Sequence, residues 1–346
     1  MSEMYQKPVL TNEVIDDYSA DDFVFVQRDE KLIDKTYQAT SYLKDVWSHF
    51  KKNKGALIGL VIIVLIIFLA VIGPMISGYA SEAIDQTHQS MAPRMPGLEN
   101  FGIFNGVERG KNVYAERGFL DVYHWFGTDT QGRDLFTRVW EGTRVSLIIA
   151  VSAAAIDIVV GMSYGLISGF FGGKIDMVMQ RFAEILNGIP TLVTVTLLGL
   201  VLPGGIITII FALMITGWIG MSRIARAEML KLKESEYVLA SKTLGAKSFS
   251  IIFKDIMPNI FGQLIIMSMF SIPNAIFTEA FLSFVGLGIP APKASLGSLI
   301  SDGYKSMTIH PYIMIAPIVV LALLMLSFNL FADGIRDAFD PNQKHS

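Results

Sequence analysis

The sequence contains no cysteine and few charged residues, and these two shortages narrow the classes of protein that it can encode. Without cysteine there is no disulfide bond, no thiolate metal site and no cysteine nucleophile. Charged residues make up 17% of the chain, whereas a soluble domain carries about 25%. The formal net charge is −3, so no basic excess points to a nucleic-acid partner. A hydrophobic share of 52% is instead typical of a membrane protein.

The chain also lacks the patterns of common catalytic and metal sites. Its five histidines are scattered, and none belongs to a His-Glu-x-x-His pattern. Residues 245–248 read Gly-Ala-Lys-Ser, like the end of a phosphate-binding loop, but, counted back from Gly245, Ala240 stands where that loop requires its first glycine. We therefore predict no catalytic site, no metal site and no cofactor bound by this chain.

Long apolar runs are what the sequence does have. Inside a bilayer every backbone amide must be bonded within its own segment, so an apolar run of about 20 residues predicts a spanning helix. Six runs predict an all-α, polytopic membrane protein with six transmembrane helices. They lie at about 56–76, 145–169, 177–202, 206–220, 260–284 and 312–331.

The positions of lysine and arginine predict the orientation of these spans, because cations near helix ends are retained on the cytoplasmic side. Four lysines lie within residues 44–54, before the first span, and seven cations lie within residues 223–254. The turn at 203–205 carries none. Both termini of this multi-pass protein of the cell membrane are therefore predicted to be cytoplasmic, and residues 79–141 to be extracytoplasmic.

The spans and loops divide the chain into four parts. Residues 1–54 are polar and acidic, unlike a secretory signal, and are predicted to form a cytoplasmic tail. Residues 55–142 hold the first span and the extracytoplasmic segment. Residues 143–335 form the membrane core, with a cytoplasmic loop at 221–259, and residues 336–346 form a second cytoplasmic tail.

The cytoplasmic loop between the fourth and fifth spans has the pattern of a docking element. Glu236 stands where a helix dipole favours an anion, and Gly245 can end a short helix in the left-handed conformation. A second helix is expected from Ser248 to near Pro258. The apolar side of the first helix is expected to comprise Tyr237, Val238, Leu239, Ala240 and Leu244. A short helix on a basic loop suits a groove of a cytosolic partner.

A polar motif precedes the second span and reads Gly-Thr-Asp-Thr-Gln-Gly-Arg-Asp over residues 127–134. Thr128 and Asp129 can cap a helix, and the apolar residues that follow predict an interfacial helix with Trp140 near the lipid headgroups. We favour this structural interpretation over direct contact with a substrate. Asp129 and Arg133 can pair across one helical turn. The candidate residues of the motif are Gly127, Thr128, Asp129, Gly132, Arg133 and Asp134.

Four charged residues fall within the predicted spans, where a charge is costly and faces the protein interior or a wet path. Asp157, near the middle of the second span, fits a buried hydrogen-bonding role as well as a pathway role. Arg181 and Glu184 stand three residues apart, and we favour a local ion pair. Glu279, near the outer end of the fifth span, either lines the pathway or braces its helix.

The cytoplasmic loop resembles the coupling motif of ABC-importer permeases, whose pattern is Glu-Ala-Ala, three residues, Gly, nine residues, Ile, one residue, Leu-Pro. The corresponding positions are Leu239, Ala240, Ser241, Gly245, Asp255, Met257 and Pro258. Several depart from that pattern and resemble the peptide-transporter branch, in which Tyr-Val precedes small residues and the loop ends in Pro-Asn. Those pairs are Tyr237 with Val238 and Pro258 with Asn259.

Further segments, in the expected order, resemble the C-type subunit of oligopeptide and dipeptide permeases. They include residues 126–134, residues 279–288 and residues 329–341, while Glu184 stands where that family usually has aspartate. The resemblance covers about residues 43–341. It implies the type I ABC importer permease fold and half of a transmembrane pathway for oligopeptides or dipeptides.

The resemblance also implies partners. They are a second homologous permease subunit, two cytosolic ABC ATPases that bind ATP and Mg²⁺, an extracytoplasmic peptide-binding protein, the peptide substrate and membrane lipid. Three alternatives stay open: a related permease for nickel or another small solute, an intramembrane enzyme, and a scaffold. A nickel path favours clustered histidines or carboxylates, and an enzyme needs paired catalytic groups within the spans; neither pattern is visible.

Overall fold

The computed structural model describes residues 42–339, with side-chain positions from residue 46. The chain divides into two compact units, of which the first ends at Asp45 and the second begins at Val46. Residues 1–41 and 340–346 lie outside the described part. The predicted cytoplasmic tails are therefore described only over residues 42–54 and 336–339. The second unit holds every element from α2 onward.

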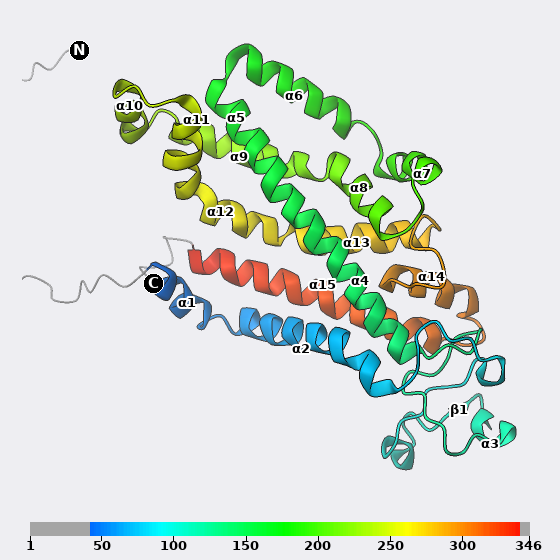
Figure 1. Cartoon of the computed structure of the whole chain (residues 1–346). Helices are drawn as coiled ribbons and strands as arrows, with labels where there is room; N and C mark the ends of the chain where they lie inside the picture. The colour runs from blue at the N-terminus through cyan, green and yellow to red at the C-terminus, as the bar shows by residue number, and fades with distance from the viewer. Residues whose placement is uncertain (1–41, 340–346) are drawn as a thin grey trace, which may run out of the picture. The chain divides into compact units, whose positions relative to one another are not determined.

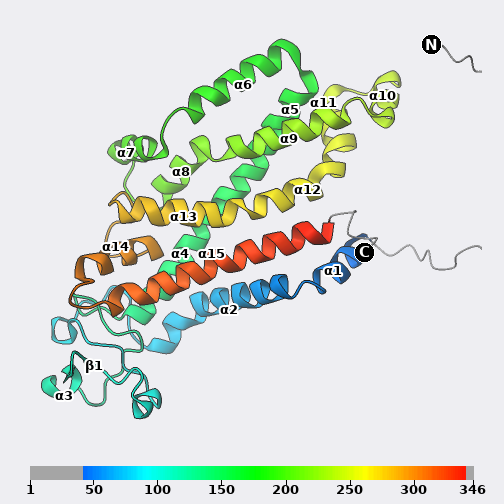
Figure 2. The same cartoon turned by 180° about the vertical axis from the view of Figure 1, so that it is seen from behind.

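The regular secondary structure of the described residues is helical apart from one short hairpin (Figure 1). The strands β1 (Val107–Glu108) and β2 (Lys111–Asn112) pair antiparallel, with Val107 opposite Asn112. The long helices pack side by side, and Figure 2 shows the same arrangement from behind. The helices are α1 (Tyr42–Phe50), α2 (Lys54–Ser77), η4 (Gln86–His88), η5 (Leu98–Phe101), α3 (Val113–Arg117), α4 (Leu135–Ile156), η6 (Asp157–Met162), α5 (Ser163–Phe171), α6 (Gly173–Asn187), α7 (Thr191–Val201), α8 (Ile206–Thr216), α9 (Trp218–Leu232), α10 (Glu236–Thr243), α11 (Ser248–Ser250), η7 (Ile251–Ile256), α12 (Met257–Met269), α13 (Ser271–Phe284), α14 (Leu296–Ser306) and α15 (Tyr312–Phe339).

Five helical segments of the described chain are long and apolar enough to cross a membrane, and the bent pair of α6 and α7 makes a sixth if it counts as one span. The prediction of six spans agrees with the number obtained when α6 and α7 count as one span. The predicted third span, at about residues 177–202, is sharply bent, because the axes of α6 and α7 differ by 79°. The break falls at residues 188–190, where Ile189 precedes Pro190 and is therefore disfavoured in a helical conformation. The five segments are Lys54–Ser77, Leu135–Phe171, Ile206–Leu232, Ser248–Phe284 and Tyr312–Phe339.

The core of the second unit lies where α4 packs against α2 and α13, and α15 packs along α2. Ile63, Trp140, Ile149, Ile276 and Leu324 are buried together in one hydrophobic cluster there. Burial of a large apolar side chain in a water-facing region contributes about 1.5–3 kcal/mol. Within the membrane, close packing and hydrogen bonds between helices supply the stabilisation instead.

Glycine spacing brings α5 and η6 very close to α9. Gly161, Gly165 and Gly169 recur every four residues and lie against the backbone or side chains of α9. A Cβ atom at Gly165 would lie only 2.1 Å from the carbonyl oxygen of Ser222. Small residues at this spacing allow two membrane helices to approach closely and pack tightly. The pair of α5 and α9 is thus a tightly packed unit.

The ends of the long helices define two opposite ends of the second unit (Figure 1). Helices α10 and α11 lie at one end, which we call the coupling end. Helices α7 and α14, the β1 hairpin and α3 lie at the other end, and both views agree on this arrangement. The candidate site residues therefore lie in three regions. These are the end that holds the α10 loop, the end that holds the 127–134 motif, and the membrane core between the two ends.

Candidate functional site

Helix α10 at the coupling end is closed by the glycine that the sequence predicts. The amide of Gly245 donates to the carbonyl of Lys242 at 3.0 Å, and the amide of Ala246 donates to the carbonyl of Ser241 at 3.1 Å. This pair of hydrogen bonds is a Schellman motif, which requires a left-handed residue just after the helix. Gly245 has a φ of +79°, so the predicted role of this glycine in ending the helix agrees with the structure.

The apolar side chains of α10 do not form a single face. Val238 is fully buried, in a cluster with Leu166 of α5, Met229 of α9 and Ile252 of η7. Leu239 and Leu244 instead face outward, and 87% of the Leu244 surface is exposed. One buried side chain therefore fixes α10 to the membrane core, while the other large apolar side chains of α10 and its neighbours are exposed. The exposed side chains are Tyr237, Leu239, Leu244 and Phe249.

The helix after Ser248 does not end near Pro258, so that expectation is wrong. It runs through the π-helical turn η7 into α12 and α13, as one segment from Ser248 to Phe284. Pro258 falls in the first turn of α12, after the widened π turn, where a missing backbone N–H is tolerated. Asn259 is exposed, and its side-chain amide donates to the carbonyl of Asp255 at 2.8 Å.

The 127–134 motif forms a buried turn at the opposite end. Both of its glycines have positive φ, +80° at Gly127 and +78° at Gly132. A Cβ atom at Gly132 would lie 1.8 Å from the carbonyl oxygen of Asp85, and one at Gly127 would lie 2.5 Å from that of Met91. Thr128 is fully buried, and its hydroxyl accepts a hydrogen bond from the amide of Met91 at 2.8 Å. The motif thus holds the segment between α2 and α4 against its own backbone.

Asp129 and Arg133 form the predicted ion pair, with 2.6 Å between Oδ2 and Nε. They do not pair along a helix, because the amide of Asp129 donates to the carbonyl of Arg133 across a turn and α4 begins only at Leu135. Arg138 approaches the same carboxylate, with its Nε 3.7 Å from Oδ2. Two guanidinium groups therefore share one buried aspartate.

Asp134 caps α4, because its side chain accepts a hydrogen bond from the amide of Thr137 at 2.9 Å. Its other oxygen lies 2.8 Å from Nδ1 of buried His124. His88 lies beside His124, with 5.3 Å between the ring centroids. Burial lowers the pKa of His88, against the opposing effect of Asp85. This end of the protein is thus closed by a compact network of buried polar groups.

The stretch after the motif does not form a separate interfacial helix, as we expected, but is the first part of α4. Trp140 is 6% exposed and belongs to the hydrophobic core. It is packed against α2 at Gly73, where a Cβ atom would lie 2.6 Å from Cδ1 of the indole ring. Trp140 therefore lies between two helices, and its depth near the headgroups stays a prediction.

The intramembrane carboxylates occupy buried positions near hydroxyl groups. Glu279 is fully buried, and it accepts hydrogen bonds from Ser146 of α4 at 2.9 Å and from Ser283 of α13 at 2.7 Å. Such bonds allow a polar group to be buried without a large free-energy cost. Asp157 is 8% exposed, begins the π-helical turn η6 and lies near Ser271 of α13. Glu279 connects α4 with α13, which fits its bracing interpretation.

Arg181 and Glu184 form the local ion pair that their spacing predicts, with 2.7 Å between Nη1 and Oε2. Both side chains are exposed on α6, so the structure brings them together but places neither in the core. In the described part of the chain, no group of three or more histidine, aspartate and glutamate side chains is placed to hold a metal ion.

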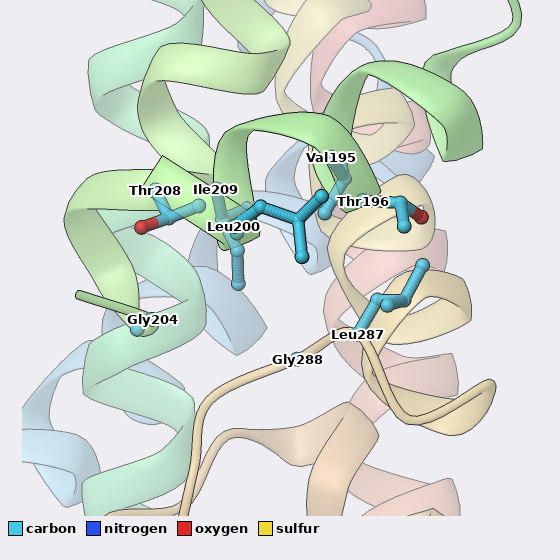
Figure 3. A pocket seen from close by; sticks show the side chains of 10 residues that line it. Val195, Thr196, Leu200, Gly204, Thr208, Ile209, Leu287 and Gly288 are labelled. Atoms are coloured by element: carbon cyan, nitrogen blue, oxygen red, sulfur yellow. The ribbon is translucent and has the colours of Figure 1, made fainter. Parts of the chain in front are cut away.

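A cavity of about 270 Å³ lies among α7, α8 and the loop that follows α13 (Figure 3). Its wall is apolar and rich in glycine, with Thr196 and Thr208 as the polar side chains. The sequence does not predict this cavity, because its wall comes from three separate segments. The lining residues are Val195, Thr196, Gly199, Leu200, Gly204, Gly205, Thr208, Ile209, Leu287 and Gly288.

Comparison with known proteins assigns this architecture to a family. Residues 161–345 match the family described as binding-protein-dependent transport system inner membrane component, and residues 41–93 match the N-terminal TM domain of oligopeptide transport permease C. The chain belongs to the family of binding-protein-dependent transport system inner membrane components. The resemblance noted in the sequence is thereby confirmed, and with it an all-α, polytopic permease of the ABC importer class.

Two relatives resemble this permease over nearly their whole length. The oligopeptide transport system permease protein OppC of Bacillus subtilis (strain 168) is 44% identical over 304 residues, covering 88% of this chain and 91% of the relative. The dipeptide transport system permease protein DppC of the same organism is 40% identical over 338 residues, covering 97% and 96%. These relatives are transport components rather than enzymes, which agrees with the prediction of a transport subunit.

A solved structure described as inward facing conformations of the MetNI methionine ABC transporter also aligns with this permease. The alignment covers 59% of this chain and 97% of that chain, with 17% sequence identity and a TM-score of 0.49.

Proposed function

We propose that this permease forms half of the transmembrane pathway of an ATP-driven importer of oligopeptides or dipeptides. The observation that carries this proposal is the similarity to two peptide permeases. The alignment with an oligopeptide permease covers 88% of this chain, and the alignment with a dipeptide permease covers 97% of it. A homologous second permease would supply the other half. The same similarity favours peptides over nickel or another small solute. The glycine-rich wall of the 270 Å³ cavity suits a path that accepts varied side chains.

We further propose that α10 and its neighbours dock into a cytosolic ATPase. The exposed side chains Tyr237, Leu239, Leu244 and Phe249 supply an apolar anchor at the tip of the loop. An apolar helix on a projecting loop suits a groove in a partner. ATP and Mg²⁺ would then be bound by two such partner subunits. The coupling assignment covers Glu236, Tyr237, Val238, Leu239, Ala240, Ser241, Gly245, Pro258 and Asn259.

The packing of Val238 supports a mechanical route from the ATPase to the pathway. This side chain is buried among residues of α5, α9 and η7, so a displacement of α10 would act directly on three membrane segments. The close contact of α5 with α9 would make them move together. Closure of the ATPases would thereby rock the permease between inward-open and outward-open states, a rigid-body transition of a common type.

At the opposite end, we assign a bracing role to the 127–134 motif. Its buried turn ties the extracytoplasmic segment to the start of α4, through Gly132 against Asp85 and Asp134 at the helix cap. That segment would meet the extracytoplasmic peptide-binding protein. Glu279 would brace α4 against α13 beside the pathway, because its hydrogen bond with Ser146 runs between these helices. Asp157 would have a similar role beside Ser271 of α13.

The proposed function predicts that uptake needs the whole assembly. The permease, its partner permease, two ATPases and the peptide-binding protein, reconstituted in vesicles, should import a labelled peptide only when ATP is supplied. The purified permease alone should hydrolyse no ATP, because its sequence has no phosphate-binding loop. Import of nickel but not of peptides by the full assembly would contradict the proposal, as would stoichiometric ATP turnover by the isolated chain.

A topology with both termini in the cytoplasm predicts a labelling pattern. The chain has no cysteine, so a single introduced thiol reports its own side of the membrane. In intact cells, a membrane-impermeant reagent should label Asn105→Cys and should not label Lys242→Cys. Permeabilised cells provide the control, because both thiols should then react. Labelling of Lys242→Cys in intact cells would overturn the orientation.

A further inference from the structure

A second cavity, with a volume of about 240 Å³, adjoins the apolar one. The two cavities share Gly288, in the loop between α13 and α14. The second cavity differs from the first in its charge. Its wall contains Arg138 from α4, Lys293 from the loop, and Asp302 and Lys305 from α14. Three cations against one carboxylate make it a cavity suited to an anion.

Arg138 is the buried group in this wall and has unused hydrogen-bonding capacity. Its side chain is 2% exposed, and Nη1 donates to the carbonyls of Ser81 at 3.1 Å and Pro292 at 3.3 Å. Its buried Nε has no hydrogen-bond partner. Within residues 46–339, Nη2 has no hydrogen-bond partner either. Nε is fully buried, so Nη2 is the donor that an acceptor in the cavity can reach and pair with.

The two lysines differ in how far they are neutralised. Nζ of Lys305 lies 3.2 Å from Oδ1 of Asp302, so these two charges largely cancel. Lys293 is exposed and forms no ion pair within the part of the chain whose side chains are described. Arg138 shares Asp129 with Arg133, which is the nearer of the two cations to that carboxylate. Net positive charge therefore remains at Arg138 and Lys293.

We propose that the cavity around Arg138 and Lys293 receives the C-terminal carboxylate of the peptide during transport, while the adjoining apolar cavity accommodates side chains. This inference rests on the proposed function. The C-terminal carboxylate is the anion that every free peptide carries, whatever its sequence. Guanidinium donors recognise a carboxylate with strong, geometrically defined hydrogen bonds. An anion site beside a glycine-rich apolar cavity thus allows selection for a peptide terminus with tolerance of side chains.

The test compares a peptide with its C-terminal amide in the complete importer, reconstituted with its own ATPases and peptide-binding protein. Initial uptake rates are measured for both peptides at saturating loaded binding protein. The quantity of interest is the ratio of acid uptake to amide uptake. Any preference of the binding protein itself contributes equally to this ratio in every variant, so it cancels when variants are compared with the unaltered permease.

Arg138→Gln should lower the acid-to-amide ratio about tenfold, because it removes charge-assisted hydrogen bonds to the carboxylate. Lys293→Gln should lower it by roughly threefold, since its exposed charge is screened by solvent. Lys111→Gln removes one exposed lysine on the hairpin, outside the cavity, and should leave the ratio unchanged. Lys293 is exposed, so its variant keeps the test valid if Arg138→Gln fails to fold.

Several outcomes would overturn the inference. An unchanged ratio in Lys293→Gln and in folded Arg138→Gln would do so while the proposed function stands. An equal loss of uptake for acid and amide would show that these residues only support the fold. An equal loss that appears only in vesicles rich in anionic lipid would identify a lipid phosphate as the occupant. Failure of the unaltered assembly to import either peptide would instead remove the proposed function itself.

Discussion

Replacing Leu244 with aspartate is expected to reduce peptide uptake by the complete importer more than tenfold, while the permease still folds and inserts. The side chain is 87% exposed, so it contributes almost nothing to the stability of the isolated chain. If Leu244 enters an apolar groove of the ATPase, its loss removes about 1.5–3 kcal/mol of burial and introduces an uncompensated charge. A change of 1.4 kcal/mol corresponds to about tenfold in an equilibrium constant.

A crosslinking measurement, made on this variant and on a matched control, separates a loss of docking from a loss of folding. A thiol at Ser241→Cys, one helical turn away, should crosslink to the ATPase in the parent and much less in Leu244→Asp. Leu120→Asp provides the matched control, because Leu120 is 56% exposed in the segment between α2 and α4 and lies far along the chain from the loop. It should leave crosslinking unchanged. Normal crosslinking and normal uptake by a well-expressed Leu244→Asp permease would contradict the coupling assignment.

Hydropathy identified the membrane segments because the physical constraint is strong: an apolar run must bond all its backbone groups internally. It located the ends of the helices less well. The second span begins at Leu135 rather than near residue 145, and the fourth continues to Leu232 rather than ending near residue 220. In both cases the helix continues into sequence with charged residues, which an apolar window does not register. Helix continuity depends on backbone hydrogen bonds, which charged side chains do not interrupt.

Local chemistry predicted some contacts and missed others for a common reason. The left-handed Gly245 and the pair of Arg181 with Glu184 depend on neighbours within five residues, and the structure contains both. Their roles in function stay predictions. Neither the 270 Å³ cavity nor the position of Arg138 beside Pro292 depends on local spacing. Both arise where segments far apart in sequence meet, and a single sequence does not specify that meeting.

The difference between local and long-range contacts also explains why the sequence predicted only part of the role of Gly132. Two glycines in a short polar stretch predict a turn with positive φ. They do not say what lies beside the turn. In the structure the backbone of Asp85, 47 positions earlier, occupies the space that a side chain at Gly132 would need. The glycine therefore serves a close approach between two distant backbone segments as well as a turn.

That close approach predicts a large difference between two glycine substitutions. Gly132 and Gly110 have nearly the same φ, +78° and +79°, and both lie between α2 and α4. Alanine at either position would incur a similar cost of about 1–2 kcal/mol for the left-handed conformation. At Gly110 nothing lies within 4 Å of the new Cβ, whereas at Gly132 the Asp85 carbonyl oxygen would lie 1.8 Å away. Gly110→Ala is thus a control for backbone strain alone.

We expect Gly132→Ala to destabilise the permease by about 3 kcal/mol more than Gly110→Ala, since overpacking against a fixed backbone forces it to move. The clash is with backbone rather than with a flexible side chain, so a change of rotamer cannot relieve it. Thermal unfolding of both purified variants in the same detergent would measure the difference, with the yield of folded protein as a second readout. Equal unfolding midpoints would mean that the chain near Asp85 moves at little free-energy cost, and that the 127–134 motif does not hold the segment between α2 and α4 in place.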